Sequence, residues 1–314
     1  MSIIERAAQR LEELRRAGIE VPSSGSDPSR SRPTAEAAAR VVAVDAPQSG
    51  VPSLVRKDLR GENEQTGARQ GIQIELDLAN LATQGYVTPD KPRTRIADEF
   101  RILKRPIIAN ASTSRAVPIK HGNLVMVTSA VPGEGKTFSA INLAMSIAME
   151  LDKTVLLVDA DVARPSLPAR LGLPECRGLL DLLDDKKLDL KDTLLRTSME
   201  KLSILACGSP HAHATELLAS AAMNQLLDEL SRRYADRIII FDSPPLLVTT
   251  EARVLATQMG QIVFVVHAES TLQSDVKKAL VAIESCPIKL MMLNQARSVG
   301  QGAHGYGYGY GYGG

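Results

Sequence analysis

The residues best suited to chemistry form a glycine-rich segment between Thr128 and Thr137, which reads Thr-Ser-Ala-Val-Pro-Gly-Glu-Gly-Lys-Thr. Gly133 and Gly135 let the backbone curl so that successive N–H groups point at phosphate oxygens. Lys136 adds a positive charge for the outer phosphates, and the Thr137 hydroxyl is able to ligate Mg²⁺. These features predict a nucleotide-binding loop. Its members are Ser129, Ala130, Pro132, Gly133, Glu134, Gly135, Lys136, Thr137 and Phe138.

The segments on either side of this loop have the patterns that a phosphate site requires. Residues 124–127 are a short apolar run typical of a buried parallel strand, and residues 138–150 repeat apolar side chains at helical spacing. A strand, a glycine-rich turn and a helix together are the usual context of a phosphate-binding loop. Ala130 stands where the common pattern has its first glycine, so the alternative is an ordinary turn before a helix.

Three aspartates stand at the ends of two further apolar runs. Asp159 and Asp161 end the run 154–161, and Asp242 lies near the end of the run 237–243. Ligands of parallel sheets bind at the carboxyl ends of the strands, so we expect the three carboxylates to converge on the loop. Because Mg²⁺ prefers hard oxygen ligands, this convergence indicates a magnesium–nucleotide site. For each aspartate taken alone, the alternative is a cap of the next helix.

The chain beyond the loop alternates apolar runs with helical patterns. Such alternation predicts an α/β fold of the P-loop NTPase type, a mostly parallel sheet with helices on both faces. The expected strands are 154–161, 201–208, 237–243, 261–268 and 288–294, and the expected helices include 215–234, capped by Thr215, and 270–285.

The composition limits the classes of partner. The formal net charge is +1, Trp is absent and aromatic residues make up 3%, so neither a basic field nor a stacking surface for nucleic acid is expected. Cys176, Cys207 and Cys286 have no metal-ligand spacing and indicate reduced thiols in a cytoplasm. No apolar run approaches the ~18 residues of a membrane span. We therefore expect a cytoplasmic protein whose membrane role depends on a partner.

The 314 residues divide into four segments. Residues 1–19 predict an amphipathic helix, which either packs on its own domain or docks on another protein. Residues 20–71 are rich in Ser, Pro, Gly and Ala and indicate a flexible linker. Residues 72–299 form the folded domain, and residues 300–314 form a Gly/Tyr-rich tail.

A charged stripe lies ahead of the loop. Asp98, Arg101 and Lys104 follow one another at intervals of three residues within a helical pattern. Such a stripe is usually a solvated helix face, and here it is also a candidate assembly surface.

The tail contains four of the six tyrosines of the chain. Tyr306, Tyr308, Tyr310 and Tyr312 each lie between glycines, which let the backbone enter a narrow site in many conformations. Next to a nucleotide site these phenols are candidate phosphate acceptors. Taken alone, the segment is also typical of a low-complexity adhesive tail.

Together these segments resemble the bacterial tyrosine kinase family, P-loop proteins unrelated in fold to eukaryotic protein kinases. The resemblance is strongest to the tyrosine autokinases of exopolysaccharide loci, including those associated with exosortase systems. Residues 128–137 are similar to the Walker A motif of the family, residues 156–165 to its Walker A′ motif and residues 238–245 to its Walker B motif. The Gly-Tyr repeat resembles the C-terminal tyrosine cluster of these proteins.

The resemblance implies an ATP-dependent protein-tyrosine kinase that phosphorylates its own tail with ATP and Mg²⁺. Lys136 would hold phosphates, and Thr137, Asp161 and Asp242 would organise Mg²⁺. Asp159 would accept or orient the phenolic proton. A carboxylate with a pKa of about 4 is a weak base for a phenol with a pKa of about 10, which favours a positioning role.

The resemblance also implies partners. They are a membrane adaptor of the polysaccharide chain-length-determinant type, which would recruit the chain to the inner face of the membrane, a tyrosine phosphatase, and further copies of the chain in a ring. The stripe Asp98, Arg101 and Lys104 stands where the family has its ring-forming Glu-x-x-Arg-x-x-Arg motif, with the charge signs kept. No nucleic acid partner is expected.

Two other functions compete with this interpretation. One is an ATPase switch like the ParA and MinD proteins of partitioning and division-site placement, which have the same kind of sheet. Those proteins carry a signature lysine early in the loop, where this chain has Val131, and they lack a tyrosine tail. The other is an inert scaffold whose Gly-Tyr tail binds partners.

Overall fold

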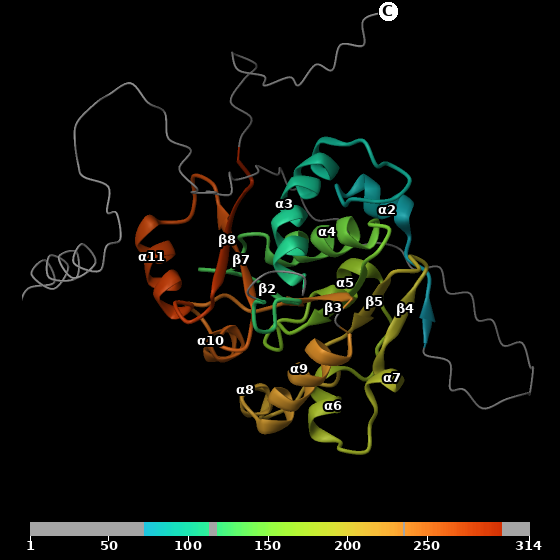
Figure 1. Cartoon of the computed structure of the whole chain (residues 1–314), viewed down its shortest axis with the longest axis vertical. Helices are drawn as coiled ribbons and strands as arrows, with labels where there is room; N and C mark the ends of the chain where they lie inside the picture. The colour runs from blue at the N-terminus through green and yellow to red at the C-terminus, as the bar shows by residue number, and fades with distance from the viewer. Residues whose placement is uncertain (1–71, 113–117, 235, 297–314) are drawn as a thin grey trace, which may run out of the picture. The chain divides into compact units, whose positions relative to one another are not determined.

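The computed structural model describes residues 72–112, 118–234 and 236–296 (Figure 1). Within these ranges the chain builds one eight-stranded sheet, in the order β1-β4-β5-β3-β6-β2-β7-β8. Neighbouring strands are parallel except for β4 and β5, which are antiparallel. The strands are β1 (Gln73–Ile74), β2 (Leu124–Ser129), β3 (Thr154–Asp159), β4 (Leu195–Thr197), β5 (Leu202–Leu205), β6 (Arg237–Asp242), β7 (Gln261–His267) and β8 (Ile288–Asn294).

The helices cover both faces of this sheet, which confirms the predicted α/β fold (Figure 1). The longest of those described is α3, whose first turn is capped by the Thr94 hydroxyl accepting from the Ala97 N–H at 3.2 Å. The helices are α2 (Leu78–Thr83), α3 (Arg95–Ala111), α4 (Lys136–Ala148), α5 (Leu167–Leu171), α6 (Leu179–Asp184), α7 (Leu190–Thr193), α8 (Ala214–Leu218), α9 (Ala221–Arg233), α10 (Thr250–Ala256) and α11 (Gln273–Ala282).

Strand β2 shows why the sheet lies between two helical layers. All six of its side chains are buried. Val125 and Val127 belong to the core formed with α3, α4 and α5, whereas Leu124 and Met126 belong to the core formed with α6 and α8 to α11. Successive side chains of a strand point to opposite faces, so an unbroken apolar run fits a strand covered on both sides.

The expected helix over 215–234 is two helices. The Ser220 hydroxyl accepts from the Met223 N–H at 3.2 Å and so starts α9 as a new helix. Thr215 lies inside α8 and its hydroxyl donates to Glu251 at 2.6 Å, so it is not the cap that the sequence suggested. The short strands β1 and β4 were not expected, because two or three residues carry little periodicity.

The predictions for residues 1–19, 20–71 and 300–314 lie outside the described residues. No helix in the described part of the chain combines the length and the apolar character that a bilayer crossing needs.

Candidate active site

The phosphate loop connects the carboxyl end of β2 to the start of α4 at Lys136. Gly133 and Gly135 have φ angles of 84° and 91°, in the left-handed region that glycine adopts without strain. A Cβ atom on Gly135 would lie 1.9 Å from the Asn294 amide nitrogen, so a larger residue there would displace the Asn294 side chain. The backbone therefore has the curled form that a phosphate-binding loop requires.

Polar contacts within the loop and from the ends of β7 and β8 hold the loop in place. The Glu134 carboxylate accepts from the Val131 N–H at 2.7 Å, and it also accepts from the Thr271 hydroxyl and, at 3.4 Å, from the His267 N–H. The Asn294 side chain donates to the Glu134 carbonyl at 2.9 Å. Thr271 and Asn294 were not recognised in the sequence, because they lie more than a hundred residues from the loop and match no motif.

The other predicted loop residues surround this framework. Ser129 ends β2 and its hydroxyl donates to the Val131 carbonyl at 2.8 Å. Ala130 is buried in the core, Pro132 lies exposed in the loop, and the Phe138 ring packs 5.1 Å from the ring of Tyr86. Phe138 therefore anchors α4 through its side chain.

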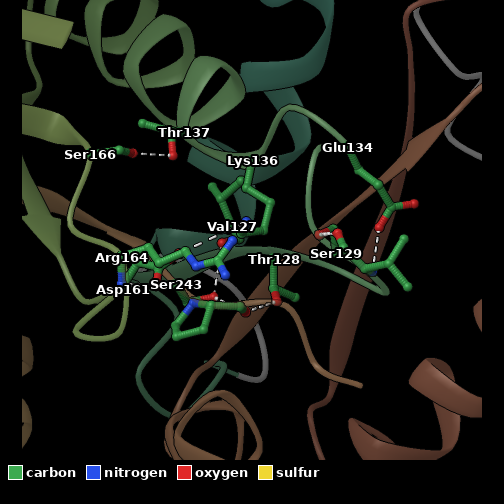
Figure 2. Close-up of polar contacts among 12 residues, drawn as sticks. Val127, Thr128, Ser129, Glu134, Lys136, Thr137, Asp161, Arg164, Ser166 and Ser243 are labelled. Carbon is green, nitrogen blue, oxygen red and sulfur yellow. Dashed lines mark hydrogen bonds and ion pairs between the residues drawn. The ribbon is translucent and has the colours of Figure 1, made fainter. Parts of the chain in front are cut away.

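Lys136 and Asp161 face each other at the mouth of the loop (Figure 2). The Lys136 ammonium lies 3.9 Å from an Asp161 carboxylate oxygen, and each side chain is 9% exposed. Burial raises the pKa of Asp161, and the nearby Lys136 charge opposes that rise. The other Asp161 oxygen accepts from the Arg164 N–H at 3.1 Å.

Asp242 lies deepest in the site, at the end of β6. It is paired in register with Asp159 of β3 and with Val127 of β2, so it lies beside both. Both of its carboxylate oxygens are buried without a hydrogen-bond partner among the described residues. Burial raises the pKa of Asp242 to about 7, and the Thr137 hydroxyl and the Lys136 charge oppose the rise. A buried carboxylate without a partner is costly unless a ligand binds it.

These residues fit a magnesium ion bound together with a nucleotide. The described residues contain no group of three His, Cys, Asp or Glu side chains arranged to hold a metal. Mg²⁺ at a nucleotide site needs only one or two carboxylates, because phosphates and water complete its octahedron. The free oxygens of Asp242 and the hydroxyl of Thr137 supply such ligands, and the Thr137 hydroxyl lies 2.9 Å from that of Ser166 (Figure 2).

Asp159 differs from the arrangement expected for it. The strand expected over 154–161 ends at Asp159, so Asp161 lies beyond it in the following loop and the two side chains do not share one face of a continuous strand. The Asp159 carboxylate is fully buried and accepts from the N–H groups of Asp161 and Leu167, each at 3.3 Å. Burial, and secondarily the Asp242 charge, raise the pKa of Asp159 to about 8. This side chain therefore holds the loop 160–167 over the strand end.

The charged stripe is divided by the fold. Asp98 and Arg101 pair on the exposed face of α3, whereas Lys104 is buried. The Lys104 ammonium lies 2.7 Å from the Glu150 carboxylate and donates to the Ser146 carbonyl at 2.5 Å. Each step of three residues falls short of a helical turn, so two steps turn the third side chain about 120° away from the first. Lys104 therefore does not share the surface of Asp98 and Arg101.

The four tail tyrosines lie outside the described residues, but the other two tyrosines of the chain are described. Tyr86 is buried and its hydroxyl accepts from Arg170 at 3.2 Å. The Tyr234 ring is half-buried and lies 4.6 Å from the guanidinium carbon of Arg237. The Tyr86 hydroxyl is therefore hydrogen-bonded inside the folded body, and the Tyr234 ring packs against an arginine.

The parallel sheet, the curled loop and the carboxylates at adjacent strand ends define the class of P-loop NTPases. Residues 120–295, more than half of the chain, match the ParA family, which is described as an NUBPL iron-transfer P-loop NTPase. The tyrosine-protein kinase YwqD of Bacillus subtilis (strain 168) is 31% identical over 220 residues, which cover 70% of this chain and 89% of YwqD. The chain belongs to the ParA-type P-loop NTPases and, within them, to the bacterial tyrosine-protein kinases.

Solved structures lead to the same fold. The crystal structure of the chimerical protein CapA2B2 is 28% identical, covers 72% of this chain and 93% of its own, and superposes with a TM-score of 0.58. The kinase domain of the Escherichia coli tyrosine kinase ETK, at 24% identity, covers 81% of this chain and 89% of its own with a TM-score of 0.61. At 24% identity, the similarity to the ETK kinase domain shows a shared fold and nothing further.

Proposed function

We propose that the chain is an autokinase, which transfers the γ-phosphoryl group of Mg²⁺-bound ATP to the tyrosines of its tail. The observation that carries this proposal is the buried Asp242 carboxylate, which has no hydrogen-bond partner in the described structure and lies beside Lys136 and Thr137. A metal-bound triphosphate would satisfy that carboxylate. The membership of the chain among tyrosine-protein kinases supports a phenol as the acceptor.

Each residue has a part in the transfer. The bond from the γ-phosphorus to the bridging oxygen breaks, a bond to the phenolic oxygen forms, and ADP leaves. Lys136 and the loop N–H groups would hold the phosphates, and Thr137, Asp161 and Asp242 would hold Mg²⁺, which would neutralise charge on the phosphates. Catalysis of this kind depends on position and charge, which this site supplies.

Asp159 orients the phenol and takes its proton late in the transfer. Its pKa of about 8 is closer to that of a phenol than the pKa of an ordinary carboxylate, which supports this role. The loop 160–167 covers the carboxylate through two hydrogen bonds of 3.3 Å, which are long and weak.

The acceptors in this proposal are Tyr306, Tyr308, Tyr310 and Tyr312. They are the tyrosines that remain once Tyr86 and Tyr234, which contact arginines in the folded body, are set aside. Four phosphates would add roughly −6 to −8 charges to the tail. Such repulsion is able to drive tails away from active sites and neighbouring subunits apart.

The test is to incubate the purified full chain with ATP and Mg²⁺ and to map phosphotyrosine by mass spectrometry. Lys136→Met should abolish the phosphotyrosine signal, because it removes the charge that holds the phosphates. Substitution of all four tail tyrosines by Phe should remove most of the signal while ATP binding, followed by titration, survives. Phosphotyrosine formed by Lys136→Met alone would refute the assignment.

We further propose that the kinase regulates exopolysaccharide synthesis and export together with a membrane adaptor of the chain-length-determinant type, which recruits it to the inner face of the membrane, and that a tyrosine phosphatase reverses the reaction. Self-association through α3 is supported by its exposed face, which carries Asp98, Arg101 and Ile102, the last 65% exposed. A cytoplasmic segment of the adaptor should raise tail phosphorylation when it is added to the kinase.

The second candidate is an ATPase switch like ParA and MinD, favoured by the match of residues 120–295 to the ParA family. The same loop and carboxylates would then direct the phosphoryl group to water. Release of inorganic phosphate without any labelling of the protein would support the switch. Transfer to the tail would support the kinase.

A further inference from the structure

A cavity of about 530 Å³ lies beside the active site and has no part in the nucleotide site described above. Its wall is formed by the segment after β3 and the segment after β5, two strands that are neighbours in the sheet. Four prolines contribute to the wall, together with Leu173 and two cysteines. The prolines are Pro165, Pro168, Pro174 and Pro210.

The cavity shares a wall with the loop that faces the phosphates. Pro165 and Pro168 flank Ser166 and Leu167. The Ser166 hydroxyl lies 2.9 Å from that of Thr137, and the Leu167 N–H donates to the Asp159 carboxylate at 3.3 Å. A ring held in the cavity would therefore lie one loop away from the site of phosphoryl transfer.

We propose that this cavity binds the phenol ring of an acceptor tyrosine from the segment 305–314 of this chain. The inference rests on the proposed kinase function and adds the place where the acceptor docks. Flat apolar proline and leucine surfaces suit the faces of an aromatic ring, and a pocket of this kind needs few polar groups to orient its ligand. Glycines on both sides of each tyrosine allow the backbone to pass the rim.

The length of the chain beyond β8 is sufficient for this contact. Strands β8 and β5 run parallel and are separated by five strand spacings, which amount to roughly 24 Å at about 4.8 Å each. Their carboxyl ends lie at the same edge of the sheet. Tyr306 lies ten residue steps beyond residue 296, and such a segment spans up to about 33 Å when extended. Every tail tyrosine is therefore within reach of the cavity, and so is the tail of a second copy of the chain.

The charges of the wall favour release of the product. Glu175 is the single charged residue of the lining, which contains no Lys, Arg or His. Phosphotyrosine carries a charge of about −2 at neutral pH and would meet no cation there. The cavity therefore distinguishes the substrate phenol from its product.

Cys176 allows a test that does not depend on kinase activity. Of the three cysteines of the chain, Cys207 and Cys286 are buried, whereas Cys176 is half-buried and lines the cavity. Burial raises the pKa of Cys176, so a small neutral thiol reagent such as methyl methanethiosulfonate is used at mildly alkaline pH. The rate of Cys176 modification is followed by mass spectrometry in the full chain, without ATP.

The wild-type chain should react at Cys176 at least about threefold more slowly than a full-length variant with all four tail tyrosines replaced by Ala, because a tethered ligand has a high effective concentration. Replacement by Phe should preserve most of the protection. The Lys136→Met chain should be protected like the wild type, so protection is measured whether or not the protein is a kinase. Equal rates in the wild type and the Ala variant overturn the docking proposal and leave the kinase proposal untouched.

A second variant tests the consequence for transfer. Cys176→Trp fills the cavity and should lower tail phosphorylation at least about tenfold relative to Cys176→Ala, which corresponds to about 1.4 kcal/mol. Both variants should bind ATP with the same affinity, which also shows that they fold. Equal phosphorylation by the two variants would contradict the proposal.

Discussion

At the scale of single residues, the site contains a buried carboxylate whose negative charge lowers the stability of the ligand-free protein. Asp242 has two buried carboxylate oxygens without a hydrogen-bond partner in the described structure. Its folded-state pKa of about 7 lies above the ordinary value of 3.8, so folding takes up a proton between these two pH values. The stability of the ligand-free protein must therefore fall as the pH rises through this window.

Asp242→Asn should make the ligand-free protein more stable at pH 8, by up to a few kcal/mol, because the amide removes the buried charge. The gain should shrink near pH 5, where the wild-type carboxyl holds its proton. Thermal unfolding at both pH values, without Mg²⁺ or nucleotide, measures the effect. Asp152→Asn, at an exposed position, serves as the control and should change little. If Asp242→Asn were no more stable than the wild type at pH 8, the prediction would be wrong, because the Asp242 charge would then be stabilised by its surroundings.

The sequence indicated these aspartates because each follows an apolar strand, and the structure brings Asp159 and Asp242 side by side in register. The contacts that hold the loop could not be predicted in the same way. Glu134 is bound by Thr271 and Asn294, whose neighbourhood is created only when β7 and β8 join the sheet. A local pattern contains no information about such a distant pairing.

At the scale of elements, the central feature is the contact between α3 and the end of α4. Lys104 donates to the Ser146 carbonyl in the last turn of α4 and pairs with Glu150 beyond it. A cation at a helix C-terminus is favourable because the free carbonyls carry partial negative charge. The helix that exposes Asp98 and Arg101 is thus fixed to the helix that begins at the phosphate loop.

Lys104→Met keeps most of the side-chain volume but leaves Glu150 without its buried partner. We expect a loss of about 1–3 kcal/mol in the free energy of unfolding at pH 7, measured by urea denaturation. Arg101→Met, on the exposed face, should cost at most about 0.5 kcal/mol. Similar losses from the two variants would contradict the assignment of Lys104 to the interior.

The same pair has a defined pH dependence. The hydrogen bond from Lys104 lowers the pKa of Glu150 below 4.5. Its stabilising contribution is therefore complete above that ordinary value and is lost as the pH falls through the lower folded-state pKa. The difference between the wild type and Lys104→Met should accordingly narrow as the pH is lowered from 7 towards 4 and below.

The elements also show where sequence patterns succeed and fail. The strand 288–294 was predicted with its observed bounds, because its apolar run is isolated by turns. The helix 215–234 was not, since the pattern continues through Ser220, whose capping role depends on its backbone conformation. The charged stripe predicts a solvated face for Lys104, and nothing in that local pattern reveals its buried partner, because Glu150 is distant in sequence.

At the scale of the whole molecule, the proposed self-association would bring the tail of one copy close to the active site of another. We expect phosphoryl transfer between chains as well as within one chain, because the tail of a second copy is also long enough to reach this edge of the sheet. A full chain with its four tail tyrosines replaced by Phe should phosphorylate the tail of Lys136→Met when the two are mixed, at a rate that rises with protein concentration. Mass spectrometry distinguishes the two tails, and an unlabelled Lys136→Met partner would indicate transfer within one chain.

The hydrogen bond from Asn294 to the Glu134 carbonyl connects the last strand, β8, to the glycine-rich loop. Asn294 is the final residue of β8, and the tyrosine-bearing segment continues from that strand. If a neighbouring copy captured this segment, the force would act on β8, whose last side chain holds the Glu134 carbonyl of the glycine-rich loop. Binding of the nucleotide by the loop would then depend on the force applied to the tyrosine-bearing tail.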